Sequence, residues 1–229
     1  MSQTDLALST IEIEPQGPVH ASIIWMHGLG ADAHDFEPIV PELRLPATLG
    51  ARFVFPNAPI RPVTLNGGMR MRAWYDVFSL DLPREEDQVG VQASAAAIDR
   101  LLEREQQRGI PAERIVLAGF SQGGAMALHT GLRYRQRLAG ILALSCYIPL
   151  AGTLATERQA VNQHTPLFIA HGDYDAVIPM RYGQQSAEAL KSLGYAVDWN
   201  DYGMGHEVCW EEIGDISAWL QRVLAVSGT

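Results

Sequence analysis

Short apolar runs recur along the chain, and each one ends at a glycine, a proline or a polar residue. They cover residues 21–27, 52–56, 115–120, 140–145 and 167–171. Near-continuous apolar runs of this length are typical of β-strands that are buried on both faces of a sheet. A sixth run, 197–202, alternates with polar Asp198 and Asn200 and therefore predicts a strand at the outside of the sheet.

Helical patterns lie between these runs, at residues 85–108, 123–137, 182–193 and 211–225. The first pattern opens with acidic residues and closes with Arg104, Arg108 and then Gly109, which suits the helix dipole and a glycine stop. Strands that alternate with helices predict a mostly parallel central sheet flanked by helices, an α/β fold. Residues 57–84 lack clear periodicity but are rich in aromatic residues, so we expect an ordered loop over the sheet edge.

The composition supports a globular protein and excludes several classes of partner. The 229 residues carry 17 basic and 26 acidic side chains, which gives a formal net charge of −9. This balance argues against nucleic acid, since phosphate binding requires a basic face, and against attraction to anionic membranes. The first ten residues do not read as a signal peptide, and the longest apolar stretch, 138–150, is too short to span a membrane. We therefore expect a cytoplasmic protein with no stable membrane anchoring.

The most informative motif is GFSQGG at residues 119–124. An apolar strand runs directly into it and a helical pattern follows, so it is Gly-x-Ser-x-Gly in the strand–turn–helix context of a nucleophile elbow. An ordinary glycine turn is the alternative, and this context argues against it. We predict that Ser121 is a nucleophile and that the backbone N–H of Gln122 faces the developing negative charge.

A serine nucleophile needs a base and an orienting carboxylate, and both candidates follow later strands. In hydrolase sheets the order along the chain is serine, acid, histidine, each just beyond the carboxyl end of a strand. His206 follows the run 197–202 and is the predicted base. Asp173 and Asp175 both follow the run 167–171. We favour Asp175, which lies further past the strand end, and expect Asp173 to bond loop amides.

The loop HGLG at residues 27–30 supplies the second candidate donor for an oxyanion hole, the Leu29 N–H. A phosphate-binding loop is the alternative, but the GxGxxG and GxxxxGK[ST] spacings are absent. His27 and His171 end strands and are expected to be structural. The remaining histidines show no metal-ligand spacing, and we predict neither a metal nor a cofactor.

Seven motifs follow one another in an order known from one family. They are HGLG at 27–30, NAP at 57–59, AWYD at 73–76, GFSQGG at 119–124, LSCY at 144–147, HGDYD at 171–175 and GMGHE at 203–207. Together they make the chain resemble the small carboxylesterase/acyl-protein thioesterase family of the α/β-hydrolase fold, in particular its bacterial carboxylesterases. The resemblance implies nucleophile Ser121, acid Asp175, base His206 and oxyanion amides at Leu29 and Gln122.

The resemblance also implies the reaction and the organisation of the chain. We expect a single hydrolase domain over residues 1–229, with its core at about 20–226 and no large cap. The implied activity is that of a serine carboxylesterase acting on a small-molecule ester or acyl thioester through an acyl-enzyme. The alternative is an acyl-protein thioesterase or lysophospholipase that acts on long acyl chains. A non-catalytic ligand-binding protein would show a damaged triad or oxyanion loop, and all five positions are filled here.

The acyl portion of the substrate is expected to lie against apolar side chains near the nucleophile. The candidates are Trp74, Phe78, Tyr147, Val177 and Met180. Eukaryotic thioesterases of the family tend to carry tryptophan where this chain has Tyr147, which leaves the preferred acyl length open. The sequence equally leaves open whether the protein is a monomer or a homodimer.

Overall fold

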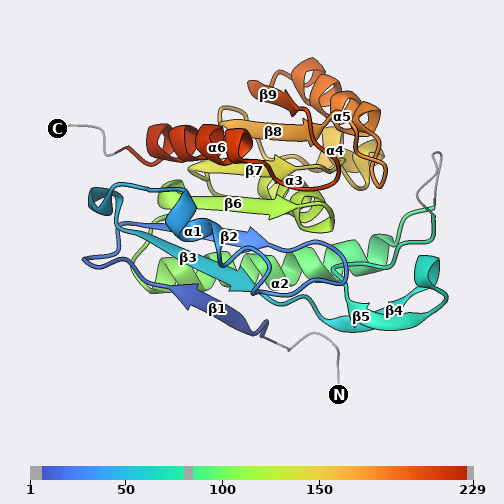
Figure 1. The fold of residues 1–229 in the computed structure, drawn as a ribbon, viewed down its shortest axis with the longest axis horizontal. Helices are drawn as coiled ribbons and strands as arrows, with labels where there is room; N and C mark the ends of the chain where they lie inside the picture. The colour runs from blue at the N-terminus through green and yellow to red at the C-terminus, as the bar shows by residue number, and fades with distance from the viewer. Residues whose placement is uncertain (1–6, 80–84, 226–229) are drawn as a thin grey trace.

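A seven-stranded sheet runs through the middle of the molecule in the computed structural model, which describes residues 7–79 and 85–225 (Figure 1). The strand order is β1-β3-β2-β6-β7-β8-β9, in which only the β1–β3 pair is antiparallel. The strands are β1 (Thr10–Ile13), β2 (Ala21–Met26), β3 (Ala51–Pro56), β6 (Ile115–Phe120), β7 (Gly140–Leu144), β8 (Leu167–Gly172) and β9 (Val197–Tyr202).

The mostly parallel sheet confirms the predicted α/β-hydrolase architecture. Each of the six predicted runs forms a strand, with bounds that agree to within one residue. The four central strands β2, β6, β7 and β8 are fully or almost fully buried along their length, as near-continuous apolar runs require. Strand β9 lies at one edge of the sheet, where its alternating polar residues remain partly exposed.

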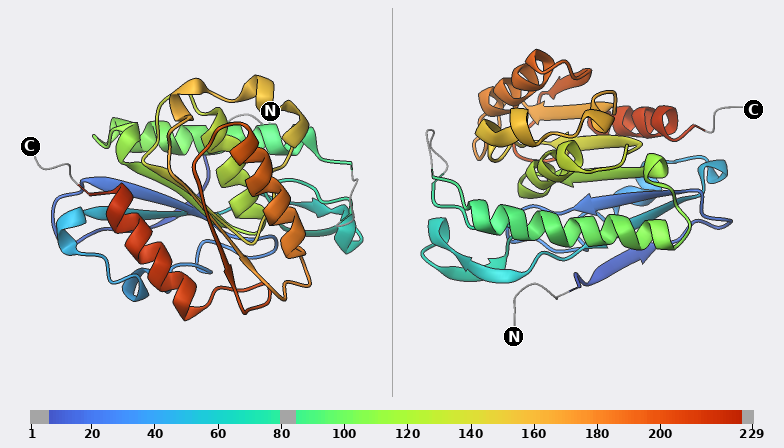
Figure 2. Two further views of the ribbon diagram at one scale, coloured as in Figure 1. Left: turned by 90° about the horizontal axis from the view of Figure 1, so that it is seen from above. Right: turned by 180° about the vertical axis from the view of Figure 1, so that it is seen from behind.

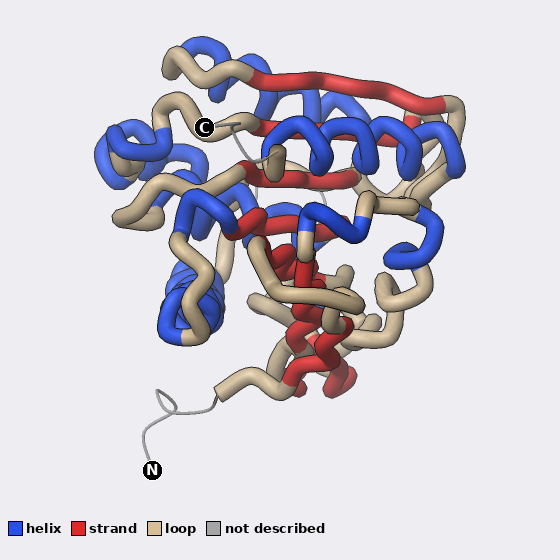
Figure 3. Tube along the Cα trace, turned by 90° about the vertical axis from the view of Figure 1, so that its left-hand side faces the viewer, coloured by secondary structure: helices blue, strands red, loops and turns tan. Residues whose placement is uncertain are grey.

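Helices cover both faces of the sheet (Figures 2 and 3). They are α1 (Ile39–Glu42), α2 (Gln88–Gln107), α3 (Gln122–Arg133), α4 (Ala151–Glu157), α5 (Met180–Ser192) and α6 (Trp210–Val223). Helices α2, α3, α4 and α5 pack with alternate strand residues in one apolar cluster, and α1 and α6 pack with the intervening residues in the other. None of the helices in the described ranges is long and apolar enough to cross a membrane.

The segment expected as an ordered loop contains a hairpin. Strands β4 (Ile60–Val63) and β5 (Met69–Arg72) pair antiparallel in a separate two-stranded sheet. The turn between them uses Gly67 and Gly68, whose φ angles of 65° and 80° favour glycine. The loop prediction therefore missed two short strands, and its last residues, 80–84, lie outside the described part of the chain.

Candidate active site

The predicted nucleophile stands in a strained turn between β6 and α3. Ser121 has φ 55° and ψ −121°, and its N–H donates to the Leu144 carbonyl of the neighbouring strand at 2.8 Å. A left-handed φ is costly for a residue other than glycine, and such strain is typical of a nucleophile elbow. The turn packs so closely against β2 that a Cβ on Gly123 would lie 2.2 Å from the carbonyl oxygen of Met26. The sequence GFSQGG therefore folds this way only with glycine at that position.

The structure brings Ser121, His206 and Asp175 into one chain of hydrogen bonds. His206 Nε2 lies 2.9 Å from the Ser121 hydroxyl oxygen, and Nδ1 lies 2.7 Å from Asp175 Oδ2. The serine follows β6, the aspartate follows β8 and the histidine follows β9, so all three side chains gather at the carboxyl edge of the sheet. This is the geometry of a nucleophile, a base and an orienting acid.

The environment of Asp175 keeps its carboxylate ionised and fixed. Its Oδ1 accepts the N–H groups of Val177 and Ile178 at 2.9 and 2.8 Å. Burial alone would raise the pKa of Asp175, but hydrogen bonds from His171, His206 and the Ile178 N–H outweigh it and hold that pKa well below the usual range. The carboxylate can therefore orient His206 without taking up its proton.

The structure corrects the expectation for Asp173. The loop amides that we assigned to it bond Asp175 instead, because the loop folds back over the carboxyl group of Asp175. Asp173 itself is exposed to solvent, and its backbone N–H donates to the Tyr202 carbonyl oxygen at 2.9 Å. One aspartate thus holds both the loop amides and the histidine.

Leu29 and Gln122 line the same cleft as Ser121. The Gln122 N–H belongs to the first turn of α3, where amides have no acceptor within the helix. Within the described ranges, no hydrogen bond occupies the Leu29 N–H. Two such donors beside a serine hydroxyl could bind the oxyanion of a tetrahedral intermediate.

The cleft beside Ser121 has a volume of about 260 Å³ and a largely apolar wall. The predicted residues Tyr147 and Val177 line it. Six other apolar or aromatic residues also line it and were not predicted, namely Ala31, Leu65, Tyr75, Val77, Phe120 and Ile178. One edge of the wall is polar, because the Tyr75 and Tyr147 hydroxyl groups lie 2.8 Å apart.

The other three predicted wall residues lie elsewhere. Phe78 and Met180 do not border the cleft, and Trp74 is fully buried with its indole N–H bonded to the His27 carbonyl oxygen at 2.9 Å. Residues 74 and 75 form a bend and not a strand, so strand alternation does not set the directions of these side chains. Tyr75 and Val77 line the cleft, whereas Trp74 and Phe78 do not. No periodicity in this part of the sequence identifies the correct pair.

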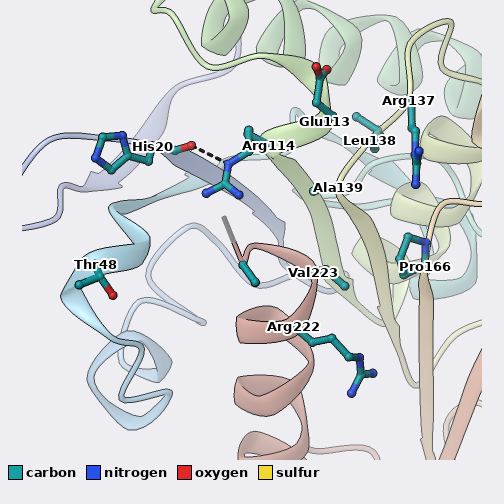
Figure 4. Close-up of a pocket in the computed structure, with 11 residues that line it drawn as sticks. His20, Thr48, Glu113, Arg114, Arg137, Leu138, Ala139, Pro166, Arg222 and Val223 are labelled. Atoms are coloured by element: carbon teal, nitrogen blue, oxygen red, sulfur yellow. Dashed lines mark hydrogen bonds between the residues drawn. The ribbon is translucent and has the colours of Figure 1, made fainter. Parts of the chain in front are cut away.

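A second, larger groove lies at the opposite edge of the sheet (Figure 4). Its volume is about 940 Å³, and it is lined by residues that precede β6, β7 and β8 and by the end of α6. It borders none of the predicted site residues, so size does not identify the active site here. Among the described residues, no group of three or more histidine, cysteine or acidic side chains could hold a metal ion.

Comparison with known proteins identifies a family and several relatives. The model of the phospholipase/carboxylesterase family matches residues 9–224. Acyl-protein thioesterase 1 of Neurospora crassa is 42% identical over 213 residues, which cover 89% of this chain and 87% of the relative. Acyl-protein thioesterase 1 of Yarrowia lipolytica is 40% identical over 207 residues, which cover 88% and 91%.

Several solved structures resemble this chain in fold and in sequence. The crystal structure of Zea mays acyl-protein thioesterase 2 has a TM-score of 0.84 and 32% identity, covering 95% of this chain and 99% of that one. Arabidopsis thaliana SOBER1 has a TM-score of 0.85 and 30% identity, covering 90% and 100%. Esterase PE8 has a TM-score of 0.81 and 27% identity, covering 95% and 100%.

Proposed function

The chain belongs to the phospholipase/carboxylesterase family and is a serine hydrolase of carboxylic esters, and we propose that Ser121, His206 and Asp175 carry out the reaction. The observation that carries this proposal is the unbroken hydrogen-bond chain from Asp175 through His206 to Ser121, at 2.7 and 2.9 Å. The two amides beside the cleft support it, because acyl transfer needs both a nucleophile and an oxyanion site.

In the first step, the Ser121 oxygen attacks the ester carbonyl and its proton passes to Nε2 of His206. Asp175 accepts the Nδ1–H of the imidazole, so it selects the tautomer with a free Nε2 and stabilises the imidazolium that forms. The N–H groups of Leu29 and Gln122 bind the oxyanion. The bond between the acyl carbon and the leaving oxygen then breaks, and His206 protonates the departing alkoxide. In the second step His206 takes a proton from water, whose oxygen attacks the acyl carbon. The bond to the Ser121 oxygen breaks, and His206 returns the proton to that oxygen as the acid is released.

The acyl portion of the substrate lies against the apolar wall formed by Tyr147, Val177 and the wall residues that the sequence analysis missed. Such a wall binds hydrocarbon through loss of water-exposed apolar surface. The substrate is a small-molecule ester or an acyl thioester, and the relatives named acyl-protein thioesterase 1 favour including the thioester.

We also propose that residues 1–229 form one hydrolase domain that works in the cytoplasm. The family match over residues 9–224 supports a single domain. The two cysteines, Cys146 and Cys209, are both free, as is usual for a protein of a reducing compartment.

Replacement of the nucleophile tests the proposed function. We expect Ser121→Ala to lower the rate of ester hydrolysis by about 10⁴–10⁶-fold and to leave the circular dichroism spectrum unchanged. The assay measures p-nitrophenyl esters of increasing acyl length alongside an acylated-peptide thioester. Ser217→Ala is the matched control, because the Ser217 hydroxyl bonds the Leu43 carbonyl oxygen away from the cleft. A Ser121→Ala variant with near-normal turnover would overturn the assignment.

A further inference from the structure

Residues 72–75, which we call the brace, lie against the loop that carries Leu29. The Gly30 N–H donates to the carbonyl oxygen of the first brace residue at 2.9 Å. The indole Nε1–H of Trp74 donates to the His27 carbonyl oxygen, also at 2.9 Å. These two bonds flank Leu29 in the sequence, so the brace holds the loop on both sides of the Leu29 amide.

The brace is also held by the side chain of Gln122. The Gln122 Oε1 accepts the Trp74 backbone N–H at 2.8 Å, and its Nε2 donates to the Tyr75 carbonyl oxygen at 2.8 Å. Both ends of the amide are used and the residue is only 4% exposed, so its orientation is fixed. Gln122, which lines the cleft beside Ser121, is therefore tied through its side chain to the segment that holds Leu29.

Three further hydrogen bonds anchor this arrangement in the core. The Trp74 carbonyl oxygen accepts the Ser94 hydroxyl of α2. The imidazole of His27 accepts the Ala58 N–H at Nε2 and donates from Nδ1 to the Gly28 carbonyl oxygen at 2.7 Å. Burial lowers the pKa of His27, which favours the neutral ring that this pattern of donor and acceptor requires.

We propose that the Gln122 side chain and Trp74 are positioning residues, which set the spacing and direction of the Leu29 and Gln122 amides so that both bind one oxyanion. The inference rests on the proposed function, because it assigns a role to residues behind that same site. It also explains the tryptophan of the AWYD motif, because Trp74 is fully buried and therefore cannot contact the substrate. Oxyanion donors contribute to rate only when held close to the productive geometry.

The test replaces the Gln122 side chain while its backbone N–H remains. Gln122→Met removes both hydrogen bonds to the brace at nearly constant volume. Since loss of a whole oxyanion donor costs about 10²–10³-fold in kcat, we expect displaced donors to cost about 10–10²-fold, with KM changed less than about threefold. A kcat within about twofold of the wild-type value would overturn the proposal.

Gln122→Glu distinguishes hydrogen bonding from a packing effect, also where the methionine variant folds poorly. The ionised carboxylate cannot donate to the Tyr75 carbonyl oxygen, whereas the protonated acid donates and accepts as the native amide does. Burial raises the pKa of such a carboxyl group, so protonation begins at mildly acidic pH. We expect the ratio of variant kcat to wild-type kcat to rise as the pH falls from about 8 to about 5. A pH-independent ratio for Gln122→Glu would contradict the positioning role.

Matched controls separate this inference from general destabilisation. Gln106 on α2 also uses its side-chain amide within the fold, on the Leu102 carbonyl oxygen and the Tyr134 hydroxyl, but it does not touch the brace. Gln106→Met and Gln106→Glu should keep the wild-type kcat at every pH. Failure of the proposed function would appear as an active Ser121→Ala variant. If only the positioning role is wrong, the Gln122 variants will be fully active while Ser121→Ala is inactive.

Discussion

Gly123 determines how closely the nucleophile elbow approaches the neighbouring strand. A methyl group there would lie 2.2 Å from the Met26 carbonyl oxygen and 2.6 Å from the His27 carbonyl oxygen. Both obstacles are backbone atoms of the β2 end and of the loop that follows it, so neither moves without displacing the Leu29 loop. Gly123 therefore matters for stability and for the oxyanion geometry together.

We expect Gly123→Ala to lower the free energy of unfolding by about 1–3 kcal/mol, the usual cost of overpacking, and to lower kcat by at least about tenfold. Urea unfolding and ester hydrolysis measure the two effects. The control is Gly205→Ala beside His206, since a Cβ there meets no atom within 4 Å. If Gly123→Ala matched the control in both measurements, the close approach of the elbow to β2 would affect neither stability nor catalysis.

The sequence predicted the proposed catalytic residues better than the residues that line the cleft. Ser121 and Asp175 follow the ends of buried strands and His206 follows the edge strand β9, and all three strands were predictable from their hydrophobic patterns. The wall depends instead on the directions of side chains in an irregular segment. The sequence there has no strand periodicity that separates Trp74 and Phe78 from Tyr75 and Val77, and only the contacts of the brace resolve the choice.

At the scale of elements, the buried strands were predictable and the short edge strands were not. Strand β1 has four residues, all partly exposed, and pairs with only one neighbour. Strands β4 and β5 are mostly exposed, and β4 contains Pro62. These strands bury little apolar surface, so their hydrophobic pattern carries little information. Strand β1 is placed by its pairing with the distant strand β3, and β4 and β5 are placed by pairing with each other.

Helix α6 contains a buried acid that makes stability depend on pH. The Glu212 side chain is fully buried next to the backbone of Cys209. Burial, reinforced by the charge of Asp215 and only partly opposed by the Cys209 N–H, raises the pKa of Glu212 to about 8. Because the folded pKa lies above the unfolded one, the native state favours the protonated acid. Its contribution to stability is complete below about pH 4.5 and is lost as the pH rises through about 8.

We therefore expect the wild-type protein to lose stability between about pH 5 and pH 9 relative to Glu212→Gln, which is neutral throughout. The difference should reach a few kcal/mol, since each pKa unit corresponds to about 1.4 kcal/mol. Urea unfolding of both proteins at several pH values provides the measurement. Glu211→Gln is the control, because Glu211 lies in the same helical turn but is exposed. Parallel pH profiles for wild type and Glu212→Gln would show that this acid does not couple folding to pH.

Across the whole molecule, the proposed catalytic residues lie at the carboxyl ends of the parallel strands, and a large network of charges lies at their amino ends. The site occupies the carboxyl ends of β6, β8 and β9. The network surrounds the fully buried Glu105 near the end of α2, where the carboxylate bonds Arg52 at the start of β3 and Arg108, each at 2.9 Å. Glu12 and Glu14 extend it to β1 and the loop that follows. The network thus ties together the three elements at one end of the sheet.

Removing Glu105 should separate stability from activity. Glu105→Ala removes the buried partner of Arg52, which then keeps only its pair with the exposed Glu14. Loss of a hydrogen bond between charged groups costs about 1.5–3 kcal/mol, so we expect urea to unfold the variant at a lower concentration. Its kcat under native conditions should stay within about twofold of wild type, because the parallel strands place Arg52 and Ser121 at opposite ends. Glu157→Ala is the control, since it breaks an exposed pair with Arg133 that should contribute less than about 1 kcal/mol. A loss of kcat in folded Glu105→Ala would show that the charge network at the amino ends of the strands affects the catalytic site at their carboxyl ends.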